Sequence, residues 1–277
     1  MKIFEANITP TVLDFLNEKL KHLTSLKIAN KKMYDIFGII DFFDNDEDLE
    51  TLKQLVSKNQ NIVTLSNREE YGDFQTNTDL ADKVTLHFAS KKVSPEIIIE
   101  PTCGKGNFII ASLKNFKNIK NIFGIEIYKP YVWETKFNIV NFFLENPENN
   151  KPEILITHCD VFNFDFKKIA KQYLTNHILI IGNPPWVTNS KLGSLNSINL
   201  PRKTNFKKHN GLDAITGKSN FDIAEFITLN LIETFQNSNG SLLLLVKNSV
   251  VKNIVFGQYK YKYKIASLEK YCNDSKK

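Results

Sequence analysis

Five short apolar runs, separated by longer mixed stretches, restrict the fold of this chain more than any other feature. They occupy residues 96–100, 121–126, 153–158, 177–182 and 241–247. Each run is dominated by Ile, Leu or Val, which is typical of strands buried on both faces of a parallel sheet. Most of the segments between them are compatible with helices. The order predicts an α/β domain whose ligands bind at the carboxyl ends of the strands.

The segment before residue 68 has a different pattern of apolar residues. Residues 11–26 and 46–59 carry apolar side chains at mixed three- and four-residue spacing, and the second stretch has an acidic first turn, so both are expected to be helical. Residues 37–43 are compatible with a helix or a buried strand. We therefore expect a small helical segment over 1–68 that braces an α/β domain over 69–277.

A glycine-bearing turn follows the first run. Residues 100–108 read Glu-Pro-Thr-Cys-Gly-Lys-Gly-Asn-Phe, and a helix-compatible stretch comes next. Glycine allows a close backbone approach to a ligand, and the amino end of a helix offers unpaired N–H groups. Glu126 ends the second run and can accept hydrogen bonds from ribose hydroxyls. These features alone fit a dinucleotide or another nucleoside cofactor equally well.

The tetrapeptide Asn183-Pro184-Pro185-Trp186 follows the fourth run and is the most specific signal in the chain. Two prolines fix φ near −65° and remove two backbone donors, so the turn is rigid. The Asn183 side-chain oxygen and the Pro184 carbonyl can then accept both hydrogens of one amino group. Trp186 offers a flat face on which a base can stack. The turn therefore predicts a site that holds an amine.

With this motif the chain resembles the amino-methyltransferases of DNA, whose signature is Asn, Asp or Ser followed by Pro-Pro and Tyr, Phe or Trp. Residues 71–76, 218–226 and Asp160 also resemble family elements, in the order of the group whose recognition sequences lie on the C-terminal side. The resemblance covers roughly residues 68–252. It implies a Rossmann-like fold that binds S-adenosylmethionine. The cofactor-binding residues it implies are Tyr71, Phe74, Gln75, Thr76, Glu100, Pro101, Gly104, Gly106, Phe108, Glu126, Asp160 and Asn183.

The activity that the resemblance implies is methyl transfer from S-adenosylmethionine to the exocyclic amine of adenine in double-stranded DNA. Such an enzyme flips the base out of the duplex and works in a restriction-modification or related system. The catalytic residues would be Asn183, Pro184, Pro185 and Trp186. Two alternatives stay open: a methyltransferase acting on an RNA base or a protein glutamine, and a non-catalytic subunit of the same fold.

Residues 187–219 form a long polar stretch, which in a compact domain usually either carries function or is a solvated, disordered loop. Its cations favour a lid that closes over phosphate and the flipped base. The expected DNA-binding residues are Lys191, Arg202, Lys203, Lys207, Lys208 and Lys218. A net charge of +6 agrees with an anionic partner, although lysine-rich composition can arise without one.

Three cysteines without paired spacing, Cys103, Cys159 and Cys272, support neither a disulfide framework nor a metal site. No membrane span or signal peptide is evident, so we expect a cytoplasmic protein. The family resemblance also predicts a C-terminal β-hairpin and a target-recognition domain, for which residues 248–277 are too short. Two interpretations stay open: the chain is half of a split enzyme whose partner, a second polypeptide, supplies target recognition, or it is a truncated product with an incomplete sheet.

Overall fold

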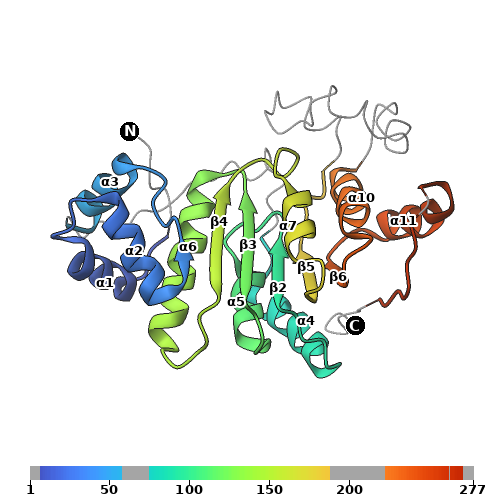
Figure 1. Cartoon of the computed structure of the whole chain (residues 1–277), viewed down its shortest axis with the longest axis horizontal. Helices are drawn as coiled ribbons and strands as arrows, with labels where there is room; N and C mark the ends of the chain where they lie inside the picture. Colours follow the sequence, from blue (N-terminus) through green and yellow to red (C-terminus); the bar gives the residue numbers. More distant parts are fainter. Residues whose placement is uncertain (1–6, 58–74, 188–221, 262, 271–277) are drawn as a thin grey trace.

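The five apolar runs are all strands of one parallel sheet, as predicted. The computed structural model describes residues 7–57, 75–187, 222–261 and 263–270. In these residues the sheet has six strands in the order β1-β4-β3-β2-β5-β6, each pair parallel (Figure 1). The runs correspond to β2 (Ile97–Glu100), β3 (Asn121–Glu126), β4 (Glu153–His158), β5 (Ile178–Gly182) and β6 (Gly240–Leu244).

Alternate residues of the strands enter two separate hydrophobic clusters, one on each face of the sheet. On β5, Leu179 and Ile181 belong to the first cluster, and Ile178 and Ile180 belong to the second. The first cluster contains α5 (Asn107–Asn115) and α6 (Lys129–Glu145), and the second contains α7 (Phe166–Gln172), α10 (Ile223–Phe235) and α11 (Asn248–Tyr261). Burial on both faces explains why the strands are continuously apolar rather than alternating. None of the helices in the described ranges is long and apolar enough to cross a membrane.

The first 57 residues add a strand to this sheet as well as helices. Helices α1 (Pro10–Leu20), α2 (Leu26–Phe37) and α3 (Asp46–Ser57) surround β1 (Ile39–Ile40), which pairs with β4. Residues 37–43, which the sequence allowed to be either a helix or a strand, therefore contain a short edge strand. Val12, Leu16 and Met33 lie in the same cluster as the core of α5 and α6. The N-terminal helices thus share a hydrophobic core with the six-stranded sheet.

The direction of strand addition reverses beside β2. From β2 the chain proceeds outward to β3 and β4, with α5 and α6 as crossovers on one face. It then returns to β5 and β6 on the other side of β2, with α7 and α10 on the opposite face. Crevices form at the carboxyl ends of strands where such a reversal occurs. The fold therefore creates a ligand site between the ends of β2 and β5.

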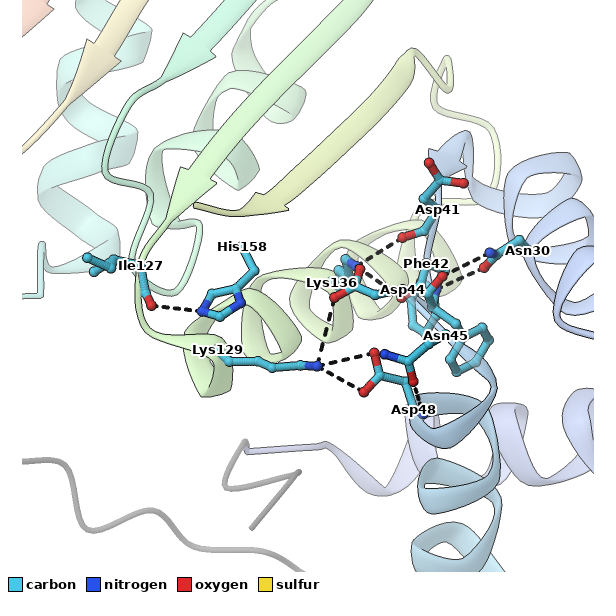
Figure 2. A network of polar contacts seen from close by, with 11 residues as sticks. Asn30, Asp41, Phe42, Asp44, Asn45, Asp48, Ile127, Lys129, Lys136 and His158 are labelled. Carbon is cyan, nitrogen blue, oxygen red and sulfur yellow. Dashed lines mark hydrogen bonds and ion pairs between the residues drawn. The ribbon is translucent and has the colours of Figure 1, made fainter. Parts of the chain in front are cut away.

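Two lysines of α6 tie the N-terminal segment to the sheet, as Figure 2 shows. The Nζ atom of Lys129 lies 3.0 Å from the buried carboxylate of Asp48, and that of Lys136 lies 3.7 Å from Asp44. Lys136 also donates to the carbonyls of Asp41 and Phe42, each at 3.0 Å. Because Lys129 begins α6 directly after the β3 loop, these contacts fix one wall of the site region to residues 41–48.

Lys136 makes stability depend on pH in an alkaline range. Burial lowers its pKa from 10.5 to about 8, although Asp44, Asp48 and Asp41 oppose this shift and Lys129 adds to it. The unfolded chain keeps this proton to higher pH than the folded protein, so the contribution of Lys136 to stability rises between about pH 8 and 10.5 and is lost below that range. The neutral amine still has two hydrogens for the two carbonyls.

Between pH 7.5 and 9.5, we expect the free energy of unfolding of the wild type to rise by about 2 kcal/mol relative to that of the Lys136→Met variant. Urea unfolding of both proteins across that range measures this difference. Lys31→Met, which removes an exposed lysine of α2, is the control and should give a flat difference. If the difference between the wild type and Lys136→Met also stayed constant with pH, Lys136 would not lose its proton in this range.

Candidate active site

A cavity lies where β2, β3, β4 and β5 end at their carboxyl edge. Its walls come from the turns that follow these four strands, from residues 75–76, and from the start of α10. The residues that line it are Gln75, Thr76, Glu100, Pro101, Thr102, Cys103, Gly104, Asn107, Phe108, Ile125, Glu126, Ile127, Tyr131, Cys159, Asp160, Val161, Phe162, Asn183, Pro185, Val187, Ile223 and Ile227. Segments far apart in sequence thus share one concave site of the kind that binds small molecules.

The glycine turn between β2 and α5 adopts a backbone that only glycine takes without strain. Gly104 and Gly106 have φ values of +53° and +77°. A Cβ on Gly106 would lie 2.7 Å from the Cγ2 atom of Thr135, a fully buried residue of α6. The Oγ1 atom of Thr135 donates to the Gly104 carbonyl at 2.8 Å, so α6 holds this turn in place.

Glu126 closes the turn from the side of β3. Its Oε2 atom accepts a hydrogen bond from the Gly104 N–H at 2.8 Å, and its Oε1 atom accepts one from the Tyr128 N–H at 2.7 Å. The residue is 8% exposed and lines the cavity. Each carboxylate oxygen has more than one acceptor site, so Glu126 can also accept from ligand hydroxyls.

Glu100 brings a second carboxyl group into the same cavity. It is 2% exposed, and its Oε2 atom has no hydrogen-bond partner among the described residues. Burial raises the pKa of Glu100 well above its usual range; a backbone hydrogen bond from Ile109 opposes this, and the negative charge of Glu126 adds to it. Burial thus disfavours the charged form of Glu100, and a cationic group nearby would lower its pKa again.

Cys103 lies between these acids and is also buried. Burial raises the pKa of its thiol well above the ordinary value, and Glu100 and Glu126 raise it further. A thiol that resists ionisation is a poor nucleophile. Cys103 therefore acts as a packing residue of the cavity wall.

The end of the cavity near β4 is polar on one side and aromatic on the other. The Oδ1 atom of Asp160 accepts from the Phe162 N–H at 2.9 Å, and burial raises the pKa of Asp160. The ring of Phe162 lies 5.3 Å from that of Phe226 of α10. A carboxyl group beside an aromatic wall suits a planar heterocycle that carries a donor group.

Residues 75 and 76 approach the glycine turn from before α4 (Thr78–Ser90). The Gln75 Oε1 atom accepts from the Lys105 N–H at 3.3 Å, and the Thr76 carbonyl accepts from the Asn107 side chain at 2.6 Å. Tyr71 and Phe74, which were expected in the same segment, lie outside the described residues. The segment that the sequence assigned to the cofactor thus contacts the glycine turn.

The turn after β5 opens into this cavity through Asn183 and Pro185, whereas Pro184 is buried. Trp186 stands at its edge with 41% of its surface exposed, and its Nε1–H donates to the Leu245 carbonyl at 3.1 Å. The Val187 carbonyl accepts from the Ile223 N–H at 3.0 Å, which attaches the turn to α10. The turn and the glycine loop therefore face one common space.

Most of the residues that the sequence pointed to come together in the structure. Asn183, Pro185 and eight of the residues expected to bind cofactor line the cavity: Gln75, Thr76, Glu100, Pro101, Gly104, Phe108, Glu126 and Asp160. Gly106 belongs to the same turn without lining it. The six cationic residues expected to bind DNA, between Lys191 and Lys218, lie outside the described residues.

Sequence reasoning missed the residues that hold these turns in place. Thr135 and Asn138 of α6 bond to the glycine turn, and Lys247 and Asp222 bond to each other beside Trp186. Nothing in the sequence marks Thr135 or Asn138, because their role depends on how α6 crosses the sheet. Lys247, in contrast, is the last residue of the apolar run over 241–247, just as Glu100 and Glu126 end their runs.

The family model described as N-6 DNA methylase matches residues 61–255. The type II methyltransferase M.NspV of Nostoc sp. is 45% identical over 208 residues, which cover 75% of this chain and 42% of that protein. The chain therefore spans less than half the length of this curated relative.

Solved structures resemble the chain at low sequence identity. A class I S-adenosylmethionine-dependent methyltransferase described as putative, from Listeria monocytogenes, has a TM-score of 0.45 at 11% identity, covering 89% of this chain and 76% of that one. The methyltransferase subunit of a type I restriction-modification system from Streptococcus thermophilus has a TM-score of 0.41 at 12% identity, covering 92% and 61%.

Proposed function

The chain belongs to the N-6 DNA methylase family, and from this we propose that it transfers a methyl group from S-adenosylmethionine to the exocyclic amine of adenine in DNA, within a restriction-modification system. One observation carries the proposal: Asn183 and Pro185 line the same cavity as Gly104 and Glu126. A turn built to hold an amine thereby shares a cavity with a turn built to hold a nucleoside.

The cavity residues fit S-adenosylmethionine in their donor and acceptor chemistry. Glu126 supplies acceptors for ribose hydroxyls, and Asp160 supplies an acceptor for the adenine amine, with Phe162 as a flat neighbour. Glu100 has a buried oxygen without a hydrogen-bond partner in the part of the chain that the structure describes, which suits the cationic end of the molecule. When bound, S-adenosylmethionine supplies an electrophilic methyl group on a positively charged sulfur.

The Asn183 side chain and the Pro184 carbonyl would make the target amine more nucleophilic. An adenine amine is a weak nucleophile because its lone pair is delocalised into the ring. If Asn183 and the Pro184 carbonyl accept both hydrogens, the nitrogen pyramidalises and its lone pair becomes available. The carbon–nitrogen bond forms as the carbon–sulfur bond breaks, and the surplus proton leaves to solvent. Holding amine and methyl in near-attack geometry can supply roughly 7–11 kcal/mol of the rate enhancement.

Labelled-methyl transfer to duplex DNA, RNA and protein, measured in parallel, tests this function. We expect label in N6-methyladenine of DNA digests, and none in RNA or protein. Label only in RNA or in protein glutamine would replace the proposal by the alternative substrates. Binding of S-adenosylmethionine without transfer to any of the three would favour a non-catalytic subunit.

Proton release provides a separate test of the role of Glu100. Because burial raises the pKa of Glu100 in the free protein and a cation beside it favours ionisation, binding of S-adenosylmethionine at a pH below that raised pKa should release a proton. Affinity should then rise up to about tenfold per pH unit until Glu100 ionises in the free protein. Isothermal titration calorimetry in buffers of different ionisation enthalpy counts the protons.

Glu100→Gln should abolish this proton release and flatten the pH dependence of affinity, because the amide cannot ionise. Glu96→Gln removes a carboxylate at the other end of the same strand and should behave as the wild type. Equal proton release by Glu100→Gln and the wild type would show that another group is responsible.

The proposal includes double-stranded DNA as substrate, a polypeptide that supplies target recognition, and a cytoplasmic site of action. The related type II enzyme is more than twice as long as the matched region. The cations between Lys191 and Lys218 remain the proposed phosphate contacts, in agreement with the net charge of +6.

A further inference from the structure

A lysine that the cavity does not include contacts the amine-holding turn from outside. Lys247 lies between β6 and α11, and its Nζ atom donates to the Trp186 carbonyl at 3.3 Å and to the Asp222 carboxylate at 2.8 Å. We propose that Lys247 is a positioning residue that fixes the orientation of Trp186, and through it the Asn183–Pro185 turn, for the methyl transfer.

Trp186 is held by residues of β6 and its continuation. The indole Nε1–H donates to the Leu245 carbonyl, two residues before Lys247, and the Leu245 N–H donates to the Gly182 carbonyl at 2.9 Å. Lys247 adds a bond to the Trp186 backbone. One short segment, 245–247, therefore contacts Gly182, which directly precedes the turn, and also the ring and the carbonyl of Trp186.

Asp222 connects Lys247 to the other side of the turn. Its Oδ1 atom caps α10 by accepting from the Ala224 N–H at 3.0 Å, which leaves Oδ2 for Lys247. The Asp222 side chain is only 14% exposed, and Val187 bonds to the neighbouring Ile223. The start of α10 and the end of β6 thus enclose residues 186–187, and the Lys247–Asp222 ion pair joins the two.

The chemistry of the turn explains why this arrangement matters. Pro184 and Pro185 restrict φ at two positions, but neither can donate a backbone hydrogen bond, so the turn depends on contacts from outside for its position. The position of a base stacked on Trp186 depends on the position of the indole ring. A misplacement of about 1 Å can cost on the order of 100-fold in rate. The inference rests on the proposed function, yet the geometry of Trp186 can be measured without any turnover.

The test uses the full chain labelled with 5-fluorotryptophan. The chain has two tryptophans, so ¹⁹F NMR should give two resonances, and Trp186→Phe identifies the exposed one. Lys247→Met should shift or broaden the Trp186 resonance and leave that of the buried Trp133 unchanged. Lys247→Arg, which keeps donors for both partners, should restore the wild-type resonance. Lys252→Met, an exposed lysine of α11, is the charge-matched control.

Kinetics on duplex DNA supply the second readout. For Lys247→Met we expect kcat to fall about tenfold or more while KM for S-adenosylmethionine stays within about twofold, since the cofactor turn is not touched. An unchanged Trp186 resonance in Lys247→Met would overturn the proposal, whether or not the chain transfers methyl groups. If Lys247→Met instead bound DNA more weakly, with a smaller dependence of affinity on salt and an unchanged Trp186 resonance, Lys247 would be a phosphate contact, and the proposal would also be overturned.

Discussion

Replacing Asn183 by Ala should reduce methyl transfer by at least on the order of 100-fold, the loss typical when one preorganised polar group of an active site is removed. Asn183 lies in the half-buried part of the turn after β5 and lines the cavity that contains the glycine loop. Alanine removes the side-chain acceptor for the target amine and leaves the two prolines intact. The measurement is the single-turnover rate of label transfer to duplex DNA at saturating S-adenosylmethionine.

Affinity for S-adenosylmethionine should change little in the same variant, since Glu126, Glu100 and the glycine turn are untouched. Asn183→Asp is the matched control: it keeps an acceptor oxygen at the same place, so we expect measurable transfer to remain. Wild-type turnover by Asn183→Ala would remove the assigned role of this side chain. Loss of cofactor binding in Asn183→Ala would instead indicate that Asn183 mainly holds the cofactor, as the resemblance also allows, or that the substitution damages the cavity.

The second large effect is expected at Glu126, where Gln should weaken S-adenosylmethionine binding about 10- to 100-fold. Hydrogen bonds to a charged group contribute about 1.5–3 kcal/mol, and 1.4 kcal/mol is a factor of ten in affinity. Glu126 accepts from the Gly104 N–H and the Tyr128 N–H through separate oxygens. A glutamine amide has one oxygen, so one of these N–H groups, or a ribose hydroxyl, would face an NH₂ group.

Calorimetric titration with S-adenosylmethionine measures this loss, and Glu148→Gln, an exposed change after α6, should leave the affinity unchanged. The unfolding transition should be recorded for each variant, because Glu126 also supports the turn itself. A Glu126→Gln protein that binds as tightly as the wild type would show that this carboxylate does not contact the ribose.

The N-terminal helices influence this site indirectly. Lys129 begins α6 three residues after Glu126, and it reaches the buried Asp48 of α3. Two residues after Glu126, Tyr128 donates to the same carboxylate that supports the glycine turn. In addition, His158 at the end of β4 contacts the Ile127 carbonyl at 3.0 Å (Figure 2). The segment before residue 58 therefore stabilises the loop that presents Glu126 to the cavity.

The sequence determined the parts of this protein that depend on local chemistry. Continuous apolar runs predicted the buried parallel strands, because a strand covered on both faces has no polar side. The glycines at 104 and 106 indicated a turn with positive φ, and the Asn183–Trp186 tetrapeptide indicated a rigid, amine-holding corner. That site residues follow the strands was also predictable, since parallel strands bring their carboxyl ends to one edge of the sheet.

Only the tertiary structure decided which long-range contacts support these turns. Residues 37–43 fitted both a helix and a buried strand locally; the open edge of β4 selected a strand for Ile39–Ile40. Thr135, Asp222 and Lys247 gain their roles from the crossing of α6, the start of α10 and the end of β6, which are distant in sequence from the turns they hold. A hydrogen bond between such residues depends on how whole elements pack, and packing leaves no periodic pattern in the chain.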